Sequence, residues 1–468
     1  MRVTVVGHSC LRVETRAGTI LVDPWLFGSC YWRSWWHFPP STEPTAEMLA
    51  PDYVYLTHHH FDHFHYPSMR RLDRDAKVLI PRFGVDVMAD EVVSLGFDRP
   101  AELVHGRILD LGDGVRVASY QYGFDDTAFV IAEDDHVVVD INDCKIRGRA
   151  LDQLLDDFGP PTLACKSHSF AQSYPVLYES DDPAQLRLVT PKTYIDDFHD
   201  VMARLRPRHA IPFGSMVGFL HPDSAPLNAH LVTPRAVVEG VAERGGIEGT
   251  DVITMAPGDV WDSESGFDRS DVDWYTDRAR HLAELAEKYA PTIAERTAAE
   301  VDVTVEWRDF DAHLGRLVRE VPRVFARRLS PRPFVFHVPS DVDRPYWWVS
   351  FRSRTVGRSA TMPEGASGLT TVPEAVLAEA IRDRIVHILH GAMRIRTRLE
   401  PGGVQSDLGF WGVVMMWELG YLPLRRSARH PRLWFAVARR WREFADQAPS
   451  VISRNPVDHL AERFGADV

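Results

Sequence analysis

The sequence has 468 residues, a length typical of two domains. Its 45% hydrophobic and 25% charged residues indicate a globular protein with a sizeable core. The formal net charge is −13, with 53 Lys and Arg residues against 66 Asp and Glu residues. This balance argues against a general nucleic-acid-binding protein and against binding to an anionic membrane surface.

The cysteine content and the apolar segments exclude further classes. Four cysteines without a C-x-x-C pair exclude a disulfide scaffold, a cysteine-rich zinc finger and an iron–sulfur centre. The opening residues MRVTVVGHSC are typical of a β-strand rather than a signal peptide. No apolar stretch reaches the roughly 18 residues of a transmembrane helix. We therefore expect a cytoplasmic protein.

Short apolar runs separated by turn signals predict many strands in the first 150 residues. Residues 2–6, 11–14 and 19–22 are predicted to form a three-stranded meander. Further strands are expected at residues 53–57, 77–80, 102–104, 115–120, 128–132 and 136–141, and helices at 67–75, 85–95 and 149–158. This mixture predicts two packed sheets with helices outside them.

Five histidines fall within residues 58–65, directly after the predicted strand at 53–57. His58, His60, Asp62 and His63 form the pattern H-x-H-x-D-H. Imidazole and carboxylate ligands suit Zn, Fe or Mn, and a turn after a strand can bring them together. A solvated polyhistidine loop is the alternative, but the run follows an apolar strand and includes an aspartate in register. We therefore predict a metal site at these four residues.

This motif, together with Gly7-His8-Ser9-Cys10 and the Asp-Pro-Trp-Leu segment at residues 23–26, resembles the metallo-β-lactamase superfamily. The resemblance implies an α/β fold of the αββα type, a β-sandwich flanked by helices. It also implies that Asp23 orients a metal-bound histidine, which agrees with the rule that a ligating histidine donates its other N–H to a carboxylate. The alternative is that Asp23 is a turn residue before Pro24.

A closer resemblance is to one branch, the CMP-N-acetylneuraminate hydroxylase-like proteins. Five segments across residues 1–230 carry it: Asp23–Leu26 with the Trp-rich sequel and Pro39-Pro40, His58–Ser68, Asn142–Cys144, Ser169–Pro175, and Ile211–Gly214 with Leu220–Asp223. The resemblance implies that Asp143 bridges two metals and that His221 is the last histidine ligand. Asp140 competes with Asp143, because a register error would exchange the two. His221 could instead be a surface loop residue. Asp62 and Asp143 are the candidate catalytic residues.

Two features depart from the pattern of these relatives. A histidine ligand usually follows the strand corresponding to residues 115–120, but residues 121–126 contain none. Asp125, Asp126 and His168 are the candidate replacements, and a carboxylate-enriched site favours Fe or Mn over Zn. The paired Cys and His motifs of a Rieske iron–sulfur domain are also missing from the sequence. An oxygenase of this kind would take electrons from an external reductase or from its substrate.

Aromatic residues are concentrated before and within the metal motif. Large aromatic loops often line ligand pockets. The candidate substrate wall consists of Trp32, Trp35, Trp36, Phe61 and Phe64, and it predicts an apolar or aromatic substrate group. The alternative is that this loop packs on the core.

The pattern beyond residue 260 is α+β. Helical spacing covers residues 273–290, where Pro291 is expected to end the helix, and residues 309–327 and 373–390. Strands are expected at 301–307, 334–338 and 347–352, and the basic stretch 425–442 is predicted to be a solvated helix face. We therefore expect a catalytic metal-binding domain at 1–260 and a smaller accessory domain at 261–468, which shapes the substrate pocket or forms a homodimer.

Two enzymatic functions fit these observations. The first is a non-haem iron oxygenase that hydroxylates a small molecule with one or two iron ions. The second is a dinuclear Zn, Mn or Fe hydrolase of an ester, amide or phosphoester, in which the metals activate water. We favour the oxygenase because of the altered ligand set and the resemblance to hydroxylases.

Overall fold

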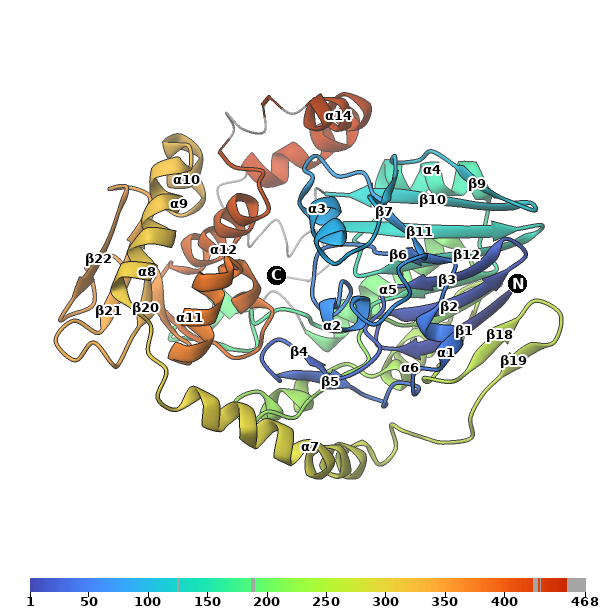
Figure 1. Cartoon of the computed structure of the whole chain (residues 1–468), viewed down its shortest axis with the longest axis horizontal. Helices are drawn as coiled ribbons and strands as arrows, with labels where there is room; N and C mark the ends of the chain where they lie inside the picture. The colour runs from blue at the N-terminus through green and yellow to red at the C-terminus, as the bar shows by residue number, and fades with distance from the viewer. Residues whose placement is uncertain (124–125, 187–189, 424–427, 430, 453–468) are drawn as a thin grey trace.

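The computed structural model describes the chain apart from residues 124–125, 187–189, 424–427, 430 and 453–468. Its first layer is an eight-stranded sheet in the order β19-β18-β1-β2-β3-β6-β7-β8 (Figure 1). The strands are β1 (Arg2–Gly7), β2 (Cys10–Thr15), β3 (Gly18–Val22), β6 (Tyr53–Tyr55), β7 (Lys77–Pro81), β8 (Ala101–Leu103), β18 (Val260–Asp262) and β19 (Gly266–Asp268). The antiparallel pairs β1–β2 and β2–β3 confirm the predicted meander.

The second layer is a seven-stranded sheet in the order β17-β15-β13-β12-β11-β10-β9. Its strands are β9 (Leu109–Gly112), β10 (Val115–Tyr122), β11 (Asp126–Glu133), β12 (His136–Asn142), β13 (Leu163–Lys166), β15 (His209–Pro212) and β17 (Asp251–Val252). Strand β11 shows that both faces of this sheet are covered by other layers. Phe129 and Ile131 face the first sheet, whereas Ala128, Val130 and Ala132 face the outer helices.

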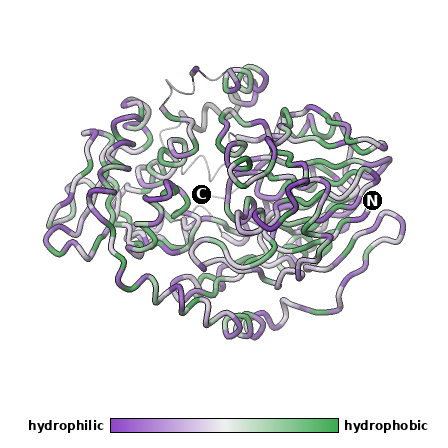
Figure 2. The backbone as a smooth tube through the Cα atoms, in the orientation of Figure 1, coloured by the Kyte–Doolittle hydropathy of each residue, from purple (hydrophilic) through white to green (hydrophobic). Residues whose placement is uncertain are grey.

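Helices cover the outer faces of both sheets. Helix α3 packs on the first sheet, and α4, α5 and α6 pack on the second. The helices of this half are α1 (Ala46–Leu49), α2 (Tyr66–Met69), α3 (Val87–Ser94), α4 (Gly148–Phe158), α5 (Pro191–Leu205) and α6 (Pro234–Glu243). The resulting αββα arrangement confirms the predicted fold. Figure 2 shows the hydrophobic segments concentrated in these sheets.

A third sheet lies in the other half of the molecule, in the order β14-β24-β23-β20-β21-β22. Its strands are β14 (Tyr178–Ser180), β20 (Phe334–His337), β21 (Tyr346–Ser350), β22 (Thr355–Ser359), β23 (Gly368–Thr371) and β24 (Arg396–Leu399). The helices of this part of the chain are α7 (Arg278–Glu300), α8 (Trp307–Phe310), α9 (Arg316–Glu320), α10 (Arg323–Leu329), α11 (Glu374–Asp383) and α12 (Val404–Glu418). Helix α14 (Pro431–Ile452) instead lies over the first half of the molecule, near α3 and α4 (Figure 1). Strand β14 joins this sheet from the first half of the chain by pairing with β24. The domain division at residue 260 stays a prediction.

Three predictions for the second half were wrong in detail. Residues 301–306 form no strand, because Val301 and Val303 are exposed and no neighbouring strand pairs with them among the described residues. Helix α7 continues through Pro291, where the chain is exposed and water can satisfy the freed carbonyl. The helix expected at 309–327 is broken, because helix α9 ends at Glu320 and Pro322 precedes α10.

Two further predicted helices are shorter than expected, and one predicted surface is partly buried. Helix α2 ends at Met69, where Arg74 binds the carbonyls of Met69 and Leu72. The helix expected at 373–390 is α11 followed by a 3₁₀ turn, Val386–His390. In the basic stretch, Arg440 is buried and donates to the Gln121 and Gly123 carbonyls, while residues 425–427 and 430 lie outside the described residues.

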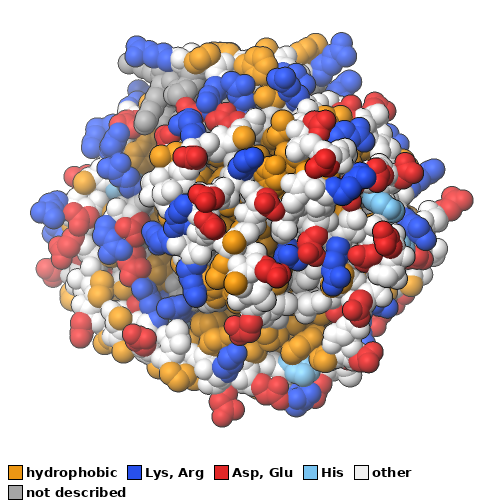
Figure 3. Space-filling view, turned by 45° about the vertical axis from the view of Figure 1, so that its right-hand side comes forward, with side chains coloured by type: hydrophobic (Ala, Val, Ile, Leu, Met, Phe, Trp, Pro, Cys, Tyr) orange, Lys and Arg blue, Asp and Glu red, His pale blue; other side chains and the backbone are white. Residues whose placement is uncertain are grey.

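A small three-stranded sheet joins the two halves. It consists of β4 (Ser29–Cys30), β5 (Trp35–His37) and β16 (Val217–Phe219). Trp35 and Phe219 from this sheet pack in one cluster with Ile388 and Met393 of the second half. The space-filling view shows acidic and basic side chains interspersed over one face of the molecule (Figure 3). Among the described residues, no helix is long and apolar enough to cross a membrane.

Candidate metal centre

The H-x-H-x-D-H motif lies where strand β6 leaves the first sheet between β3 and β7. The loop closes on itself, because the backbone N–H groups of His63 and Phe64 both donate to the His60 carbonyl, at 3.1 and 2.7 Å. This tight turn directs Asp62 and His63 inward, where they are 2% and 0% exposed. A short apolar strand followed by a tight turn thus places charged groups inside the protein.

Two groups of potential ligands meet at His63. His8, Asp62 and His63 offer donor atoms within 4.8 Å of one another, and so do His58, His63 and Asp143. His8 Nε2 lies 3.0 Å from Asp62 Oδ2, and His63 Nε2 lies 3.4 Å from Asp62 Oδ2 and 3.5 Å from Asp143 Oδ2. These are the separations expected of ligands that share a metal at about 2.0–2.2 Å.

The donor atoms have the properties that a metal requires. His63 Nε2 is buried without a hydrogen-bond partner among the described residues. Burial, together with His63 and His60, lowers the pKa of His58 well below its ordinary value, so His58 is neutral and able to ligate. Burial alone would raise the pKa of Asp62, but His63 and His8 hold it well below its ordinary value, so Asp62 is ionised. The donor set therefore fits Zn, Fe or Mn.

His60 completes the motif on the side of His58. Its Nδ1 lies 2.9 Å from His58 Nε2, so the two rings converge at one point. His60 is in neither of the two donor groups around His63. The structure therefore brings the four motif residues together but places His60 beside His58 rather than His63.

Asp23 supports the site from behind, in the position that the sequence assigned to it. Its Oδ2 accepts from His63 Nδ1 at 2.7 Å, from Thr57 Oγ1 at 2.6 Å and from Asn142 Nδ2 at 2.9 Å. Its Oδ1 accepts from the Thr57 backbone N–H at 2.8 Å. Burial would lower the pKa of His63, but Asp62 and Asp23 raise it well above its ordinary value. Asp23 thus fixes the orientation of the His63 ring.

The structure separates the two candidate bridging aspartates. Asp143 follows β12 after Asn142, whose φ of 50° turns the chain toward His63. Asp140 lies within β12, opposite Phe129 and Cys165, and neither of its carboxylate oxygens has a partner among the described residues. Burial raises the pKa of Asp140 well above its ordinary value. Asp143, not Asp140, is therefore in the donor group.

His221 is placed apart from both donor groups. Its Nδ1 accepts from the Asp223 backbone N–H at 3.2 Å, and its Nε2 lies 3.5 Å from Thr297 Oγ1. His221 is nevertheless buried, so the alternative of a surface loop residue does not describe it. His221 is thus in neither donor group, and its ligand role stays a prediction.

The candidate replacements for the missing histidine are distributed around the site. Asp126 Oδ1 lies 3.8 Å from His58 Nδ1. His168 is fully buried, neither ring nitrogen has a partner among the described residues, and burial lowers its pKa to about 3. Asp125 lies outside the described residues. Asp126 is thus the candidate seen in contact with a motif histidine.

Sequence reasoning missed two residues of the site. His8 was noted only as part of a turn, yet its ring contacts Asp62. Tyr31 donates its phenol O–H to Asp62 Oδ1, and burial together with Asp62 raises the pKa of this phenol well above its ordinary value. The positive φ of 51° at Tyr31 was invisible in the sequence, because only Gly or Asn signals such a conformation.

The aromatic residues expected to form a substrate wall have two different environments. Trp35, Trp36 and Phe64 are at most 2% exposed. The Trp35 indole donates to the Gly391 carbonyl, Trp36 stacks on Tyr289, and Phe64 packs in the core beside α3. These three rings therefore pack inside the protein and offer almost no surface to a substrate. Trp32 and Phe61 are half-buried and keep exposed surface.

Residues 2–154 match the family model described as the Beta-lactamase superfamily domain. A putative Rieske 2Fe-2S iron-sulfur protein of Mycobacterium tuberculosis is 28% identical over 327 residues, which cover 64% of this chain and 62% of the relative. The cytidine monophosphate-N-acetylneuraminic acid hydroxylase of Danio rerio is 27% identical over 176 residues, which cover 33% of this chain and 28% of that protein. The chain thus spans less than two thirds of the length of these curated relatives.

Among solved structures, a metallo hydrolase from Ignicoccus hospitalis has a TM-score of 0.37 at 19% identity and covers 55% of this chain and 96% of that one. CmlA, a diiron beta-hydroxylase from Streptomyces venezuelae, has a TM-score of 0.36 at 18% identity and covers 54% of this chain and 52% of that one. The αββα layers and the family match together define a metallo-β-lactamase-fold domain. The curated proteins that this chain is similar to include one named as a hydroxylase.

Proposed function

We propose that this protein is a non-haem iron-dependent oxygenase that hydroxylates a small molecule at the centre around His63. The observation that carries the proposal is the presence of several carboxylates in the donor set, where Asp62, Asp143 and Asp126 lie among the motif histidines. Carboxylates added to imidazole ligands shift the preference of a site from Zn toward Fe or Mn. The similarity to a hydroxylase and to proteins named for an iron–sulfur cluster agrees with redox chemistry.

Iron, when bound, would supply the redox chemistry that oxygen activation requires. His58, His60, Asp62, His63 and Asp143 would hold it, with His8 and His221 as further candidate ligands. One or two ions fit the proposal. The two donor groups share His63, whose Nε2 can bind one ion because its Nδ1 is bonded to Asp23.

The surrounding residues have distinct tasks in this proposal. Asp23 keeps the Nδ1 proton of His63 on the side away from the metal and so presents Nε2. Tyr31 donates to Asp62 and fixes which carboxylate oxygen faces the centre. Trp35 and the packing around it exclude water from this side of the site. The half-exposed rings of Trp32 and Phe61 would contact an apolar part of the substrate.

The electrons for oxygen activation would come from a donor other than an iron–sulfur cluster held by the cysteines of this chain. All four cysteines are buried, and none lies in the Cys-x-His motif of a Rieske centre. A reductase acting as a partner, or a substrate that is itself oxidised, would fill this role. Hydroxylation by an oxygenase with an external donor is therefore the complete proposal.

Hydrolysis of an ester, amide or phosphoester is the second candidate. The observation that favours it is the match to the Beta-lactamase superfamily domain, together with an ionised Asp62 at the junction of the two donor groups. In a hydrolase, Asp62 would orient a water molecule activated by the metals. Zn or Mn would then replace iron as the resident ion.

Metal analysis of protein purified without added metal separates the two functions. Iron at one or two ions per chain, with oxygen uptake when a chemical reductant is supplied, is the result expected for the oxygenase. Zinc without iron, with hydrolysis of aryl esters or phosphodiesters, would contradict it and support the hydrolase.

The ligand assignment has its own test. We expect His63→Ala and His60→Ala to lose the bound metal while circular dichroism shows an intact fold. His199→Ala is the matched control, since this histidine lies on helix α5 and its hydrogen bond is to Asp200 rather than to a residue of the metal centre. Full metal retention by both motif variants would refute the site.

A further inference from the structure

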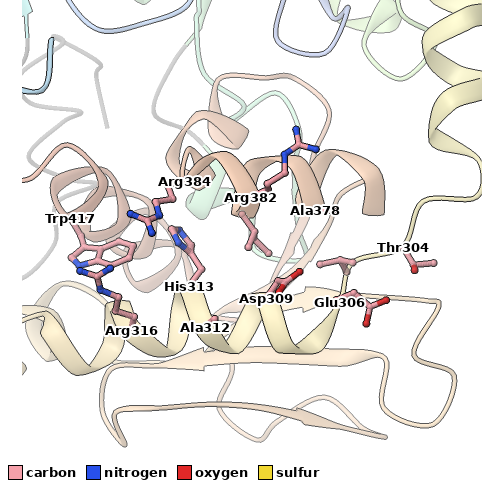
Figure 4. A pocket seen from close by; sticks show the side chains of 12 residues that line it. Thr304, Glu306, Asp309, Ala312, His313, Arg316, Ala378, Arg382, Arg384 and Trp417 are labelled. Atoms are coloured by element: carbon pink, nitrogen blue, oxygen red, sulfur yellow. The ribbon is translucent and has the colours of Figure 1, made fainter. Parts of the chain in front are cut away.

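A cavity lies in the C-terminal half of the chain. Its volume is about 380 Å³, within the range of small-molecule sites. Residues of α8, the following π-helical turn Asp311–Gly315, α11 and the end of α12 line it (Figure 4). None of the residues assigned to the metal centre is among those lining it. This cavity is independent of the proposed oxygenase function.

A buried His–Glu pair lies at one end of this cavity. His313 comes from the π-helical turn, and such turns occur frequently at functional sites. Its Nε2 lies 2.7 Å from Glu418 Oε1, and the other oxygen of Glu418 contacts His387 Nδ1 at 2.5 Å. Burial would raise the pKa of Glu418, but the bonds from these two histidines lower it to about 2. Glu418 is therefore ionised, fixes the His313 ring and leaves Nδ1 without a partner among the described residues.

Trp417 provides a flat surface beside His313. Its indole N–H donates to Glu320 Oε2 at 2.9 Å, and its ring meets the His313 ring edge-on with centroids 5.0 Å apart. The Arg316 guanidinium lies 6.0 Å from the centroid of the Trp417 ring. Contacts on several sides hold the indole in one orientation, so little conformational entropy would be lost when a ligand stacks on it.

Arg384 lies at the same end of the cavity as Trp417 and His313, and its guanidinium is available to a ligand. It has a φ of 60° at the end of α11, a position where glycine is favoured. Arg382 binds Asp383 and Arg316 binds Glu320, but the Arg384 guanidinium has no hydrogen bond or ion pair among the described residues. The Arg384 guanidinium is therefore available to pair with an anion in the cavity.

The opposite end of the cavity is acidic. Figure 4 shows Glu306 and Asp309 on the side away from Trp417, Arg384 and His313. A ligand with anionic groups at both ends would be repelled here, since like charges in proximity disfavour binding. The cavity therefore selects for one anionic end and a neutral or cationic tail.

We propose that this cavity binds a small molecule consisting of a flat ring with a single anionic group. The anion, a phosphate or a carboxylate, binds the Arg384 guanidinium, and the ring stacks on Trp417 beside His313. Arg matches the geometry of both anions through its paired N–H donors. The ring distinguishes such a ligand from free inorganic phosphate.

Isothermal titration calorimetry on the full metal-loaded chain tests this proposal with phenyl phosphate, benzoate and inorganic phosphate. We expect saturable binding of at least one aryl anion. Inorganic phosphate should bind at least about tenfold more weakly, because it cannot stack on Trp417. The tighter of phenyl phosphate and benzoate identifies the anion. No binding of either aryl anion, or equal binding of inorganic phosphate, would overturn the proposal.

Two variants separate ligand binding from a structural role. The Arg384→Gly variant should bind the aryl anion at least about tenfold more weakly than wild type. The reason is that one charge-assisted hydrogen-bonding group is lost. Its Tm should be unchanged or higher, because glycine suits a positive φ. Arg308→Ala, an exposed arginine on α8 outside the cavity, is the matched control and should bind normally. Unchanged binding in Arg384→Gly, or loss of binding in His63→Ala instead, would place the ligand elsewhere and refute the site.

Discussion

Replacing Asp23 by Asn tests whether the carboxylate behind His63 organises the metal centre. The side chain is 0% exposed and accepts four hydrogen bonds, three of them at Oδ2. Asn has the same shape but offers one acceptor oxygen. In the best orientation the oxygen replaces Oδ2, and the amide NH₂ then faces the backbone N–H of Thr57.

The magnitude follows from this geometry. A buried Thr57 N–H without an acceptor costs about 1–3 kcal/mol, and a neutral acceptor for His63 in place of a charged one costs about 1 kcal/mol more. We expect a loss of about 3 kcal/mol in the free energy of unfolding. We also expect a 10- to 100-fold loss of metal affinity, which is typical when such a supporting partner is removed.

Competition titration with a chromophoric chelator measures the affinity, and urea unfolding measures the stability. Asp52→Asn is the matched control, because its carboxylate accepts from the Thr19 N–H at 2.8 Å at an exposed turn of the same sheet. The control should keep its metal affinity and lose less than about 1 kcal/mol. Metal affinity within twofold of wild type in Asp23→Asn would refute the orienting role.

Two further predictions concern the C-terminal half. Burial raises the pKa of Asp407 to about 7, against the hydrogen bond from Tyr178 at 2.8 Å. Native Asp407 therefore keeps a proton that the unfolded chain releases above about pH 4, so stability falls as the pH rises from about 4 to 7. Asp407→Asn should remove this slope in a pH series of Tm values, and a curve parallel to wild type would contradict it. Phe410→Ala should cost about 3–5 kcal/mol by leaving a cavity against Phe334, whose ring is 3.8 Å away. Its metal content should stay normal, and loss of metal would show that the two halves are coupled.

The αββα layers were predictable because their signals are local. Strand β11 alternates between two apolar faces, and the meander β1–β3 has turn signals at its corners. The strand expected at 301–307 failed for the opposite reason. Its β-branched residues satisfy local propensity, but no neighbouring strand among the described residues supplies hydrogen bonds to them.

Part of the site was also present in the sequence. The motif at residues 58–63 could be read from its spacing after an apolar strand, and the resemblance to a known family implied that Asp23 and Asp143 lie near it. His8 and Tyr31 could not be assigned a role in the same way, because each reaches Asp62 from a segment remote in sequence. His221 is the opposite case. Its segment resembles that of the hydroxylase-like proteins, but its ring is in neither donor group of the structure.

The amino-acid sequence by itself determined the layers and the metal-ligand motif, because alternation, turns and closely spaced ligands act over a few residues. Only the tertiary structure decided which donors meet at His63, whether Asp140 or Asp143 is among them, and which aromatic rings are buried between the two halves. These outcomes depend on contacts between distant segments, such as Trp35 with Gly391 and β14 with β24. Such contacts form only where the packed layers bring those segments together, and no local pattern encodes that distance.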